Sequence, residues 1–127
     1  MSPVAAAHPS NVLAAYLESL VVGRRVVVLG DVSLGLAEEL LDRGARVVHA
    51  YDVDAARVSE ALARAAPAGD GPSYALLAGD LGVRDGAFDV AVVPDLSLFA
   101  DAGELLRRAK RLVGLGVCVV SSPNPAA

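Results

Sequence analysis

Five short segments along the chain are mainly apolar. They are rich in β-branched and aliphatic side chains. The first, at residues 25–29, is a continuous run closed by Gly30, which is typical of a strand that is buried on both faces of a parallel sheet. We therefore predict strands at residues 25–29, 46–51, 74–78, 88–93 and 117–121.

Between the runs, apolar residues recur at helical spacing. A first helix is predicted at about residues 11–21, and three others follow the capping residues Ser33, Asp54 and Asp101. Such side chains accept hydrogen bonds from the first backbone N–H groups of a helix. Asp101 with Glu104 three residues later has the spacing of a capping box. Strands that alternate with helices in this way predict an α/β fold with a mainly parallel sheet and right-handed crossovers.

Composition narrows the class of protein. With 127 residues, 54% of them apolar and only 4% aromatic, we expect one domain over 1–127 with an aliphatic core. No apolar run reaches the length of a membrane span, and the first Lys or Arg is Arg24, so we expect no spanning helix, no secretory signal and a cytoplasmic location.

Net charge and cysteine content argue against several further kinds of binding site and crosslink. Eleven Lys and Arg residues stand against 15 Asp and Glu, a net charge of −4 that argues against a nucleic-acid surface. The single cysteine, Cys118, excludes an internal disulfide and, with only two His, a zinc quartet, so we expect no metal. The preference for Arg, with Lys110 the only lysine, suggests a bacterial protein.

Four basic residues gather on the last predicted helix: Arg107, Arg108, Lys110 and Arg111. Their placement near a helix C-terminus is typical of a solvated face and of favourable charge at that end. An anionic partner is the less favoured alternative.

The segment from Gly30 to Gly35 has the spacing of a dinucleotide loop, except that Val32 stands at the middle glycine. We expect the β-branched Val32 side chain to project into the ligand's space. Asp31 would compete with a pyrophosphate at the helix N-terminus. Both residues disfavour NAD or FAD, and the alternative is that Gly30 and Gly35 only permit a tight turn.

Two acids follow the next strands. Asp52 comes 17 residues after Gly35, where its carboxylate can accept hydrogen bonds from the two hydroxyls of a ribose. Asp54 is better placed to cap a helix, which leaves Asp52 freer for a ligand. Asp80, after the third strand, can accept an adenine amino hydrogen or act as a turn residue.

In order and spacing these segments resemble the class I S-adenosylmethionine-dependent methyltransferases. The matching segments are residues 26–35, 44–48 with 52–54, 78–81, 85–90 and 112–125. The resemblance implies a three-layer Rossmann-like sandwich with a mainly parallel five-stranded sheet of order 3-2-1-4-5. It implies that S-adenosylmethionine, where it still binds, contacts Gly30, Asp31, Ser33, Gly35, Asp52, Val53, Asp80 and Leu81.

Within that set the resemblance assigns roles to the nucleoside half. Asp52 would hold the ribose, Val53 would pack on adenine, and Asp80 with the Leu81 amide would contact the adenine edge. Two departures affect the methionine half: Val28 stands where the family usually has an acid, and Val32 replaces the second glycine. Methyl transfer depends on positioning, so both changes argue against normal catalysis, and no catalytic residue is assigned.

The resemblance also implies a further helix and an antiparallel hairpin beyond the fifth strand. The chain ends at Ala127, so we expect it to lack that hairpin and to be the amino-terminal part of a longer bacterial protein. The fifth strand would then be an apolar, uncharged edge, which invites pairing. We expect a homodimer or a protein partner at Val117, Cys118, Val119 and Val120.

Three functions follow. The favoured one is a degenerate methyltransferase domain that acts as a protein-interaction or dimerisation module. The alternative is an active S-adenosylmethionine-dependent methyltransferase domain whose C-terminal part is missing from this chain. A receiver-like domain with acids at Asp31 and Asp95 is disfavoured, because residues 74–81 add a strand and no Lys follows the fifth strand.

Overall fold

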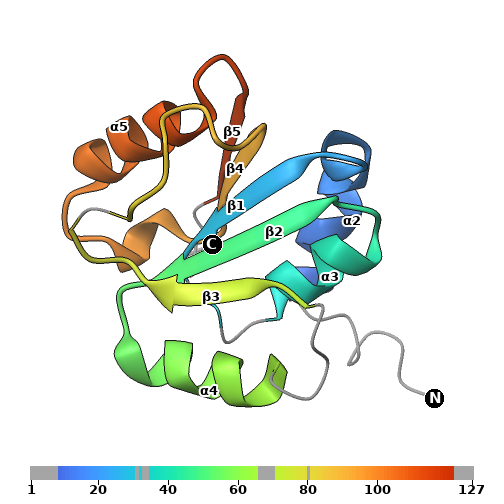
Figure 1. The fold of residues 1–127 in the computed structure, drawn as a ribbon, viewed down its shortest axis with the longest axis horizontal. Helices are drawn as coiled ribbons and strands as arrows, with labels where there is room; N and C mark the ends of the chain where they lie inside the picture. The colour runs from blue at the N-terminus through green and yellow to red at the C-terminus, as the bar shows by residue number, and fades with distance from the viewer. Residues whose placement is uncertain (1–8, 31, 33–34, 66–70, 80, 122–127) are drawn as a thin grey trace, which may run out of the picture.

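The computed structural model describes residues 9–30, 32, 35–65, 71–79 and 81–121 (Figure 1). Strands and helices alternate through most of this length, as predicted. The elements in chain order are α2 (Pro9–Val21), β1 (Arg25–Leu29), α3 (Leu36–Asp42), β2 (Val47–Asp52), α4 (Ala55–Ala65), β3 (Ser73–Leu76), β4 (Val90–Val93), the short 3-10 helix η2 (Leu96–Leu98), α5 (Ala102–Val113) and β5 (Val117–Val120).

All five strands form one parallel sheet in the order β3-β2-β1-β4-β5. The central strand β1 pairs with both β2 and β4, so that Val26 lies beside Val48 on one side and Val90 on the other. This confirms the predicted α/β Rossmann-like fold and its strand order. A receiver domain has the order 2-1-3-4-5, so that alternative is excluded.

The two faces of the sheet bury separate cores, because successive strand residues point to opposite faces. Val26 and Val28 of β1 pack in one cluster with residues of α2, α3 and α4. Val27 and Leu29 pack in the other cluster with residues of α5. The domain therefore has three layers, with residues 26–29 of the central strand buried between them (Figure 1).

Several predicted strand boundaries move by one or two residues. The fourth strand begins at Val90 rather than residue 88, because the Phe88 N–H donates to the Leu112 carbonyl of α5 instead of to a neighbouring strand. The Asp89 carbonyl then accepts from the Val117 N–H at 3.0 Å. A Cβ on Gly116 would lie 2.2 Å from the same carbonyl oxygen, so the turn into β5 requires glycine.

The predicted helix caps are confirmed where the structure describes them. Asp54 accepts from the backbone N–H groups of Ala56 and Arg57, and Asp101 accepts from that of Glu104. The third predicted cap, Ser33, lies outside the described residues. None of the described helices combines the length and the apolar character needed to cross a bilayer.

Candidate ligand site at the carboxyl ends of the strands

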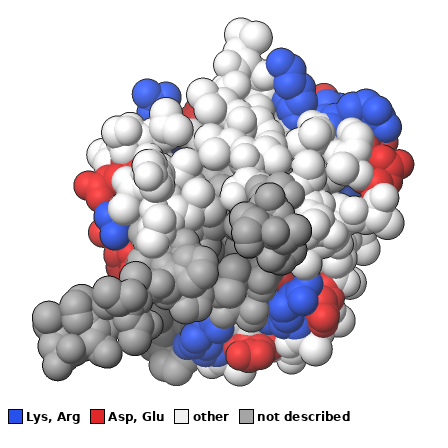
Figure 2. All heavy atoms as spheres, turned by 180° about the vertical axis from the view of Figure 1, so that it is seen from behind, with Lys and Arg blue, Asp and Glu red and all other residues white. Residues whose placement is uncertain are grey.

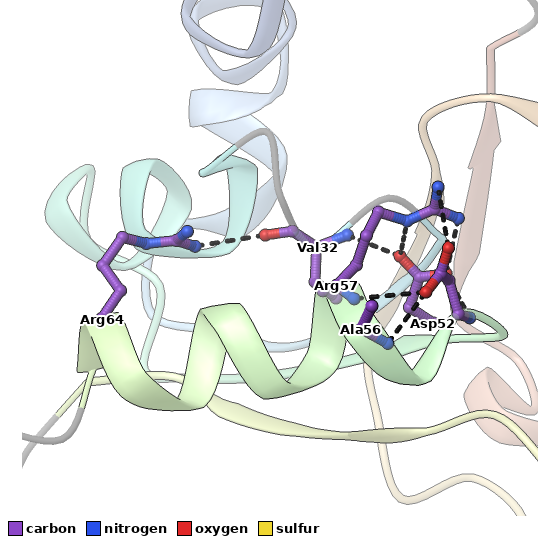
Figure 3. Close-up of polar contacts among 6 residues, drawn as sticks. Val32, Asp52, Ala56, Arg57 and Arg64 are labelled. Atoms are coloured by element: carbon purple, nitrogen blue, oxygen red, sulfur yellow. Dashed lines mark hydrogen bonds and ion pairs between the residues drawn. The ribbon is translucent and has the colours of Figure 1, made fainter.

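Asp52 is the last residue of β2, and its side chain is fully buried. The Arg57 guanidinium donates from Nε to Oδ2 at 2.8 Å and from Nη2 to Oδ1 at 2.9 Å (Figure 3). The backbone N–H of Val32 donates to Oδ2, and that of Asp54 donates to Oδ1, both at 3.0 Å. Each carboxylate oxygen therefore accepts two hydrogen bonds from the protein itself.

These contacts decide the charge of Asp52. Burial acts to raise the pKa of its carboxyl, but the hydrogen bonds from Arg57, Asp54 and Val32 outweigh it and hold the pKa below its usual value. The group is an ionised carboxylate at neutral pH. A carboxylate has about four acceptor positions, and here the protein fills all of them. Although Asp54 caps α4 as predicted, Asp52 is not left open to a ligand.

Val32 lies at the middle of the glycine loop, and both of its backbone polar groups form hydrogen bonds. Its N–H donates to Asp52, and its carbonyl accepts from Arg64 Nη2 at 3.2 Å (Figure 3). Its side chain is only 3% exposed and belongs to the core cluster with α2, α3 and α4. The expectation that this side chain projects into ligand space is therefore wrong, because the loop turns it into the core.

Arg64 continues the network to α3. Its Nε lies 2.7 Å from Glu38 Oε2, and the Tyr74 hydroxyl donates to the other oxygen of Glu38. Burial and the neighbouring Glu38 carboxylate raise the pKa of Tyr74 well above its usual value. Arg57 and Arg64 are seven residues apart, about two helical turns, so both lie on the face of α4 that meets the loop.

Gly30 follows β1 directly and has a φ of 111°, a conformation that favours glycine. Its N–H donates to the Tyr51 carbonyl at 2.7 Å. A Cβ built on Gly30 would lie 3.1 Å from Cζ of Phe99, so the phenyl ring packs on this glycine. Sequence reasoning missed Phe99. The only signal for it in the sequence is its position shortly after the fourth strand, where an aromatic side chain can reach the ligand edge of the sheet.

The other predicted ligand residues are distributed more widely. Gly35 has a φ of 77° at the start of α3, and nothing lies within 4 Å of a Cβ built there. Val53 is 48% exposed and lines a cavity of about 160 Å³ with Leu77 and Phe99. Leu81 lines a different cavity of about 360 Å³. Asp31, Ser33 and Asp80 lie outside the described residues.

The remaining predicted positions lie elsewhere. Val28 is buried in the core, and Asp95 accepts hydrogen bonds from Ser97, where it begins η2. The predicted interface strand is the edge of the sheet among the described strands. Of its residues, Val117 is 46% and Val120 is 41% exposed, whereas Cys118 and Val119 are partly buried.

Comparison by sequence finds little. No protein-family model matches the chain, and no curated protein matches it significantly. Comparison by structure finds many solved proteins with this fold.

Three solved structures illustrate the likeness. A candidate S-adenosylmethionine-dependent methyltransferase from Methanococcus maripaludis has a TM-score of 0.76 at 16% identity, over 95% of this chain and 58% of its own. An S-adenosylmethionine-dependent methyltransferase from Mesorhizobium loti has a TM-score of 0.67 at 25% identity, over 87% and 53%. A candidate Zn-dependent alcohol dehydrogenase from Rhodobacter sphaeroides has a TM-score of 0.71 at 26% identity, over 89% and 45%.

The chain spans about half the length of these proteins. Their likeness establishes the fold, and one fold of this kind supports several chemistries. Two of the three are methyltransferases, in agreement with the resemblance of the motifs. In fold the chain is a Rossmann-like α/β domain with a parallel sheet of five strands, similar to these methyltransferases.

Proposed function

We propose that this chain is a methyltransferase-like domain that has lost normal methyl transfer and acts by association with a second copy of itself. The observation that carries the first part is the closed environment of Asp52. The carboxylate at the position of the ribose acid is fully buried and accepts hydrogen bonds from Arg57, Val32 and Asp54.

A ribose would have to displace these donors. Hydrogen bonds between a guanidinium and a carboxylate are roughly twice as strong as those between neutral groups, so a pair of hydroxyls is a poor replacement for Arg57. Removing one partner of a buried ion pair costs about 3–5 kcal/mol. The Phe99 ring packed on Gly30 adds a second obstacle at the first glycine of the loop. Both contacts oppose a nucleoside in the usual place.

The edge strand supports the second part of the proposal. The Val117 N–H donates inward to the Asp89 carbonyl just before β4, and the Ser121 N–H donates to the Val93 carbonyl at the end of β4. Because inward and outward groups alternate along a strand, the N–H groups of Cys118 and Val120 point toward the open edge. An antiparallel β5 from a second copy would meet these groups and continue the sheet across a two-fold axis.

The surface beside this edge is suited to a like partner. A groove of about 560 Å³ is lined by the exposed apolar side chains of Leu20, Leu115 and Val117. Three charged residues line it as well: Arg24, Arg25 and Asp89. Among the described residues in Figure 2, which shows the face opposite the view of Figure 1, uncharged side chains prevail around the grey area and the charged ones lie toward the margins. Arg25 and Asp89 already pair with each other at 2.9 Å, so the apolar side chains of the groove are available to a second copy.

Calorimetric titration with S-adenosylmethionine and S-adenosylhomocysteine tests the first part. We expect no binding at millimolar ligand for the wild-type chain. Micromolar binding that Asp52→Ala abolishes would contradict the proposal that the cofactor site has been lost. It would instead support an active S-adenosylmethionine-dependent methyltransferase domain, the function that the methyltransferases among the structural neighbours favour.

Sedimentation velocity tests the second part. We expect a dimer at micromolar concentration that Val117→Lys and Val120→Lys convert to a monomer. Leu62→Lys is the matched control, because Leu62 is equally exposed on α4. Cys118 is the only cysteine, so a short thiol crosslinker should trap the dimer specifically at β5. A wild-type chain that stays monomeric at high micromolar concentration contradicts association through this edge.

A further inference from the structure

We propose that Arg108 and Arg111 of α5 form an anion site that takes a phosphate-bearing small molecule. The two arginines line a cavity of about 360 Å³ between α5 and the segment that follows β3. This cavity is separate from the Asp52 network, and the proposal does not depend on association of the chain. The other lining residues are Gly79, Leu81, Val83, Asp85 and Leu112.

The four basic residues of α5 have different surroundings. Arg107 pairs with Glu104 at 3.2 Å in a solvent-exposed position, as expected for a solvated helix face. Neither Arg108 nor Arg111 forms an ion pair or a side-chain hydrogen bond with any residue that the structure describes. They are three residues apart and therefore neighbours on the helix surface. Their guanidinium donors are available to one ligand in the cavity.

Guanidinium groups present planar sets of N–H donors that match the oxygens of phosphate. Arg108 is partly buried and Arg111 is exposed, and Leu81, Val83 and Leu112 provide apolar walls. Partial exclusion of water at Arg108 strengthens its attraction to an opposite charge. Asp85 is the only carboxylate among the described lining residues, so within that set two positive groups stand against one negative group.

The walls of the cavity are held together by the backbone. The Gly86 N–H donates to the Arg111 carbonyl at 2.9 Å, and the Phe88 N–H donates to the Leu112 carbonyl at 3.1 Å. These bonds fix the segment before β4 against the end of α5. The wall that contains Asp85 is therefore fixed against α5 before a ligand arrives, which reduces the entropic cost of binding.

A neighbouring cavity suggests where the rest of the ligand lies. Arg108 also lines the cavity of about 160 Å³ that contains Val53, Leu77 and Phe99. A phosphate at Arg108 can therefore belong to a molecule whose apolar part extends toward these side chains. Asp101 and Glu104 line the same small cavity and disfavour a second phosphate in it. The geometry thus fits a small molecule with phosphate at one end.

Titration with inorganic pyrophosphate, followed by calorimetry and by the arginine Nε–Hε resonances of the labelled chain, tests this site. We expect Arg108→Gln and Arg111→Gln each to weaken binding by at least about tenfold, since each removes a charge-assisted contact. Arg107→Gln, the matched control on the same helix, should leave the affinity unchanged. Asp85→Asn should increase the affinity about threefold by removing the opposing charge.

The gain from Asp85→Asn cannot arise from a variant that fails to fold. Equal weakening by Arg107→Gln and Arg108→Gln would overturn the site, because it would indicate general attraction to a basic helix. Absence of pyrophosphate binding at millimolar concentration would overturn it as well. So would a single-stranded oligonucleotide that binds more tightly than pyrophosphate and depends equally on Arg107 and Lys110, since that behaviour identifies a nucleic-acid surface.

Discussion

The Arg57 guanidinium donates a hydrogen bond to each oxygen of the Asp52 carboxylate, at 2.8 and 2.9 Å, and Asp52 is fully buried. The pair joins the first turn of α4 to the end of β2. Through the Val32 N–H it also holds the glycine loop. A residue type that suits ribose binding is thus part of an internal support for the loop.

Loss of Arg57 tests that support. We expect Arg57→Ala to lower the free energy of unfolding at neutral pH by about 3 kcal/mol, because it leaves the buried Asp52 carboxylate without its charged partner. Urea unfolding measures the change. The control is Arg107→Ala, whose exposed pair with Glu104 should contribute less than about 1 kcal/mol. Equal losses in the free energy of unfolding for the two substitutions would show that the buried pair stabilises the fold no more than an exposed one.

Acid should weaken a second ion pair. Hydrogen bonds from the Arg25 side chain and backbone lower the pKa of Asp89 from 3.8 to about 2. The carboxylate is favoured by folding, so its stabilisation is complete above pH 3.8 and is lost as the pH falls through about 2. The stability difference between the wild type and Asp89→Asn should therefore be constant above pH 4 and shrink toward pH 2, roughly over that interval.

Unfolding curves at a series of pH values measure this difference. Glu60→Gln serves as the control, because Glu60 is an exposed acid of α4. A difference for Asp89→Asn that persists unchanged below pH 2, or one that grows as the pH falls, would contradict the assignment to this ion pair.

Restoring glycine at position 32 should not restore a cofactor site. The Val32 side chain lies in the core, so Val32→Gly should create a cavity and lower the free energy of unfolding by about 3 kcal/mol. Neither Asp52 nor Phe99 changes, so S-adenosylmethionine should still not bind. Thermal unfolding and calorimetry check the two outcomes. Val53→Ala, at an exposed position, should alter stability by less than about 1 kcal/mol. Tighter cofactor binding by Val32→Gly would contradict this placement.

Gly116 should tolerate no side chain. A Cβ there would overlap the Asp89 carbonyl oxygen at 2.2 Å, and both groups belong to the backbone that joins β4 to β5. We expect Gly116→Ala to lower the free energy of unfolding by about 2 kcal/mol or more. Gly71→Ala is the matched control, because nothing lies within 4 Å of its Cβ. Chemical denaturation of the two variants should separate them clearly.

Local patterns in the sequence determined much of the fold. The period of apolar residues predicted five strands and four helices, and Asp54 and Asp101 were recognised as caps because a cap depends only on residues two or three positions away. The uncharged run at residues 117–120 was correctly placed at an edge of the sheet. The observed strand ends differ from the predicted ones where a backbone group forms its hydrogen bond outside the sheet, as the Phe88 N–H does.

Only the tertiary structure decided which distant groups share a site. Val32 and Asp52 are 20 residues apart, and no periodic pattern shows that the carboxylate takes the loop N–H and a guanidinium from α4. The Phe99 ring on Gly30 and the cavity at Arg108 likewise depend on how separate elements pack. The sequence determined residue type and strand order through local periodicity, whereas side-chain direction and partner choice arose from packing between elements far apart in the chain.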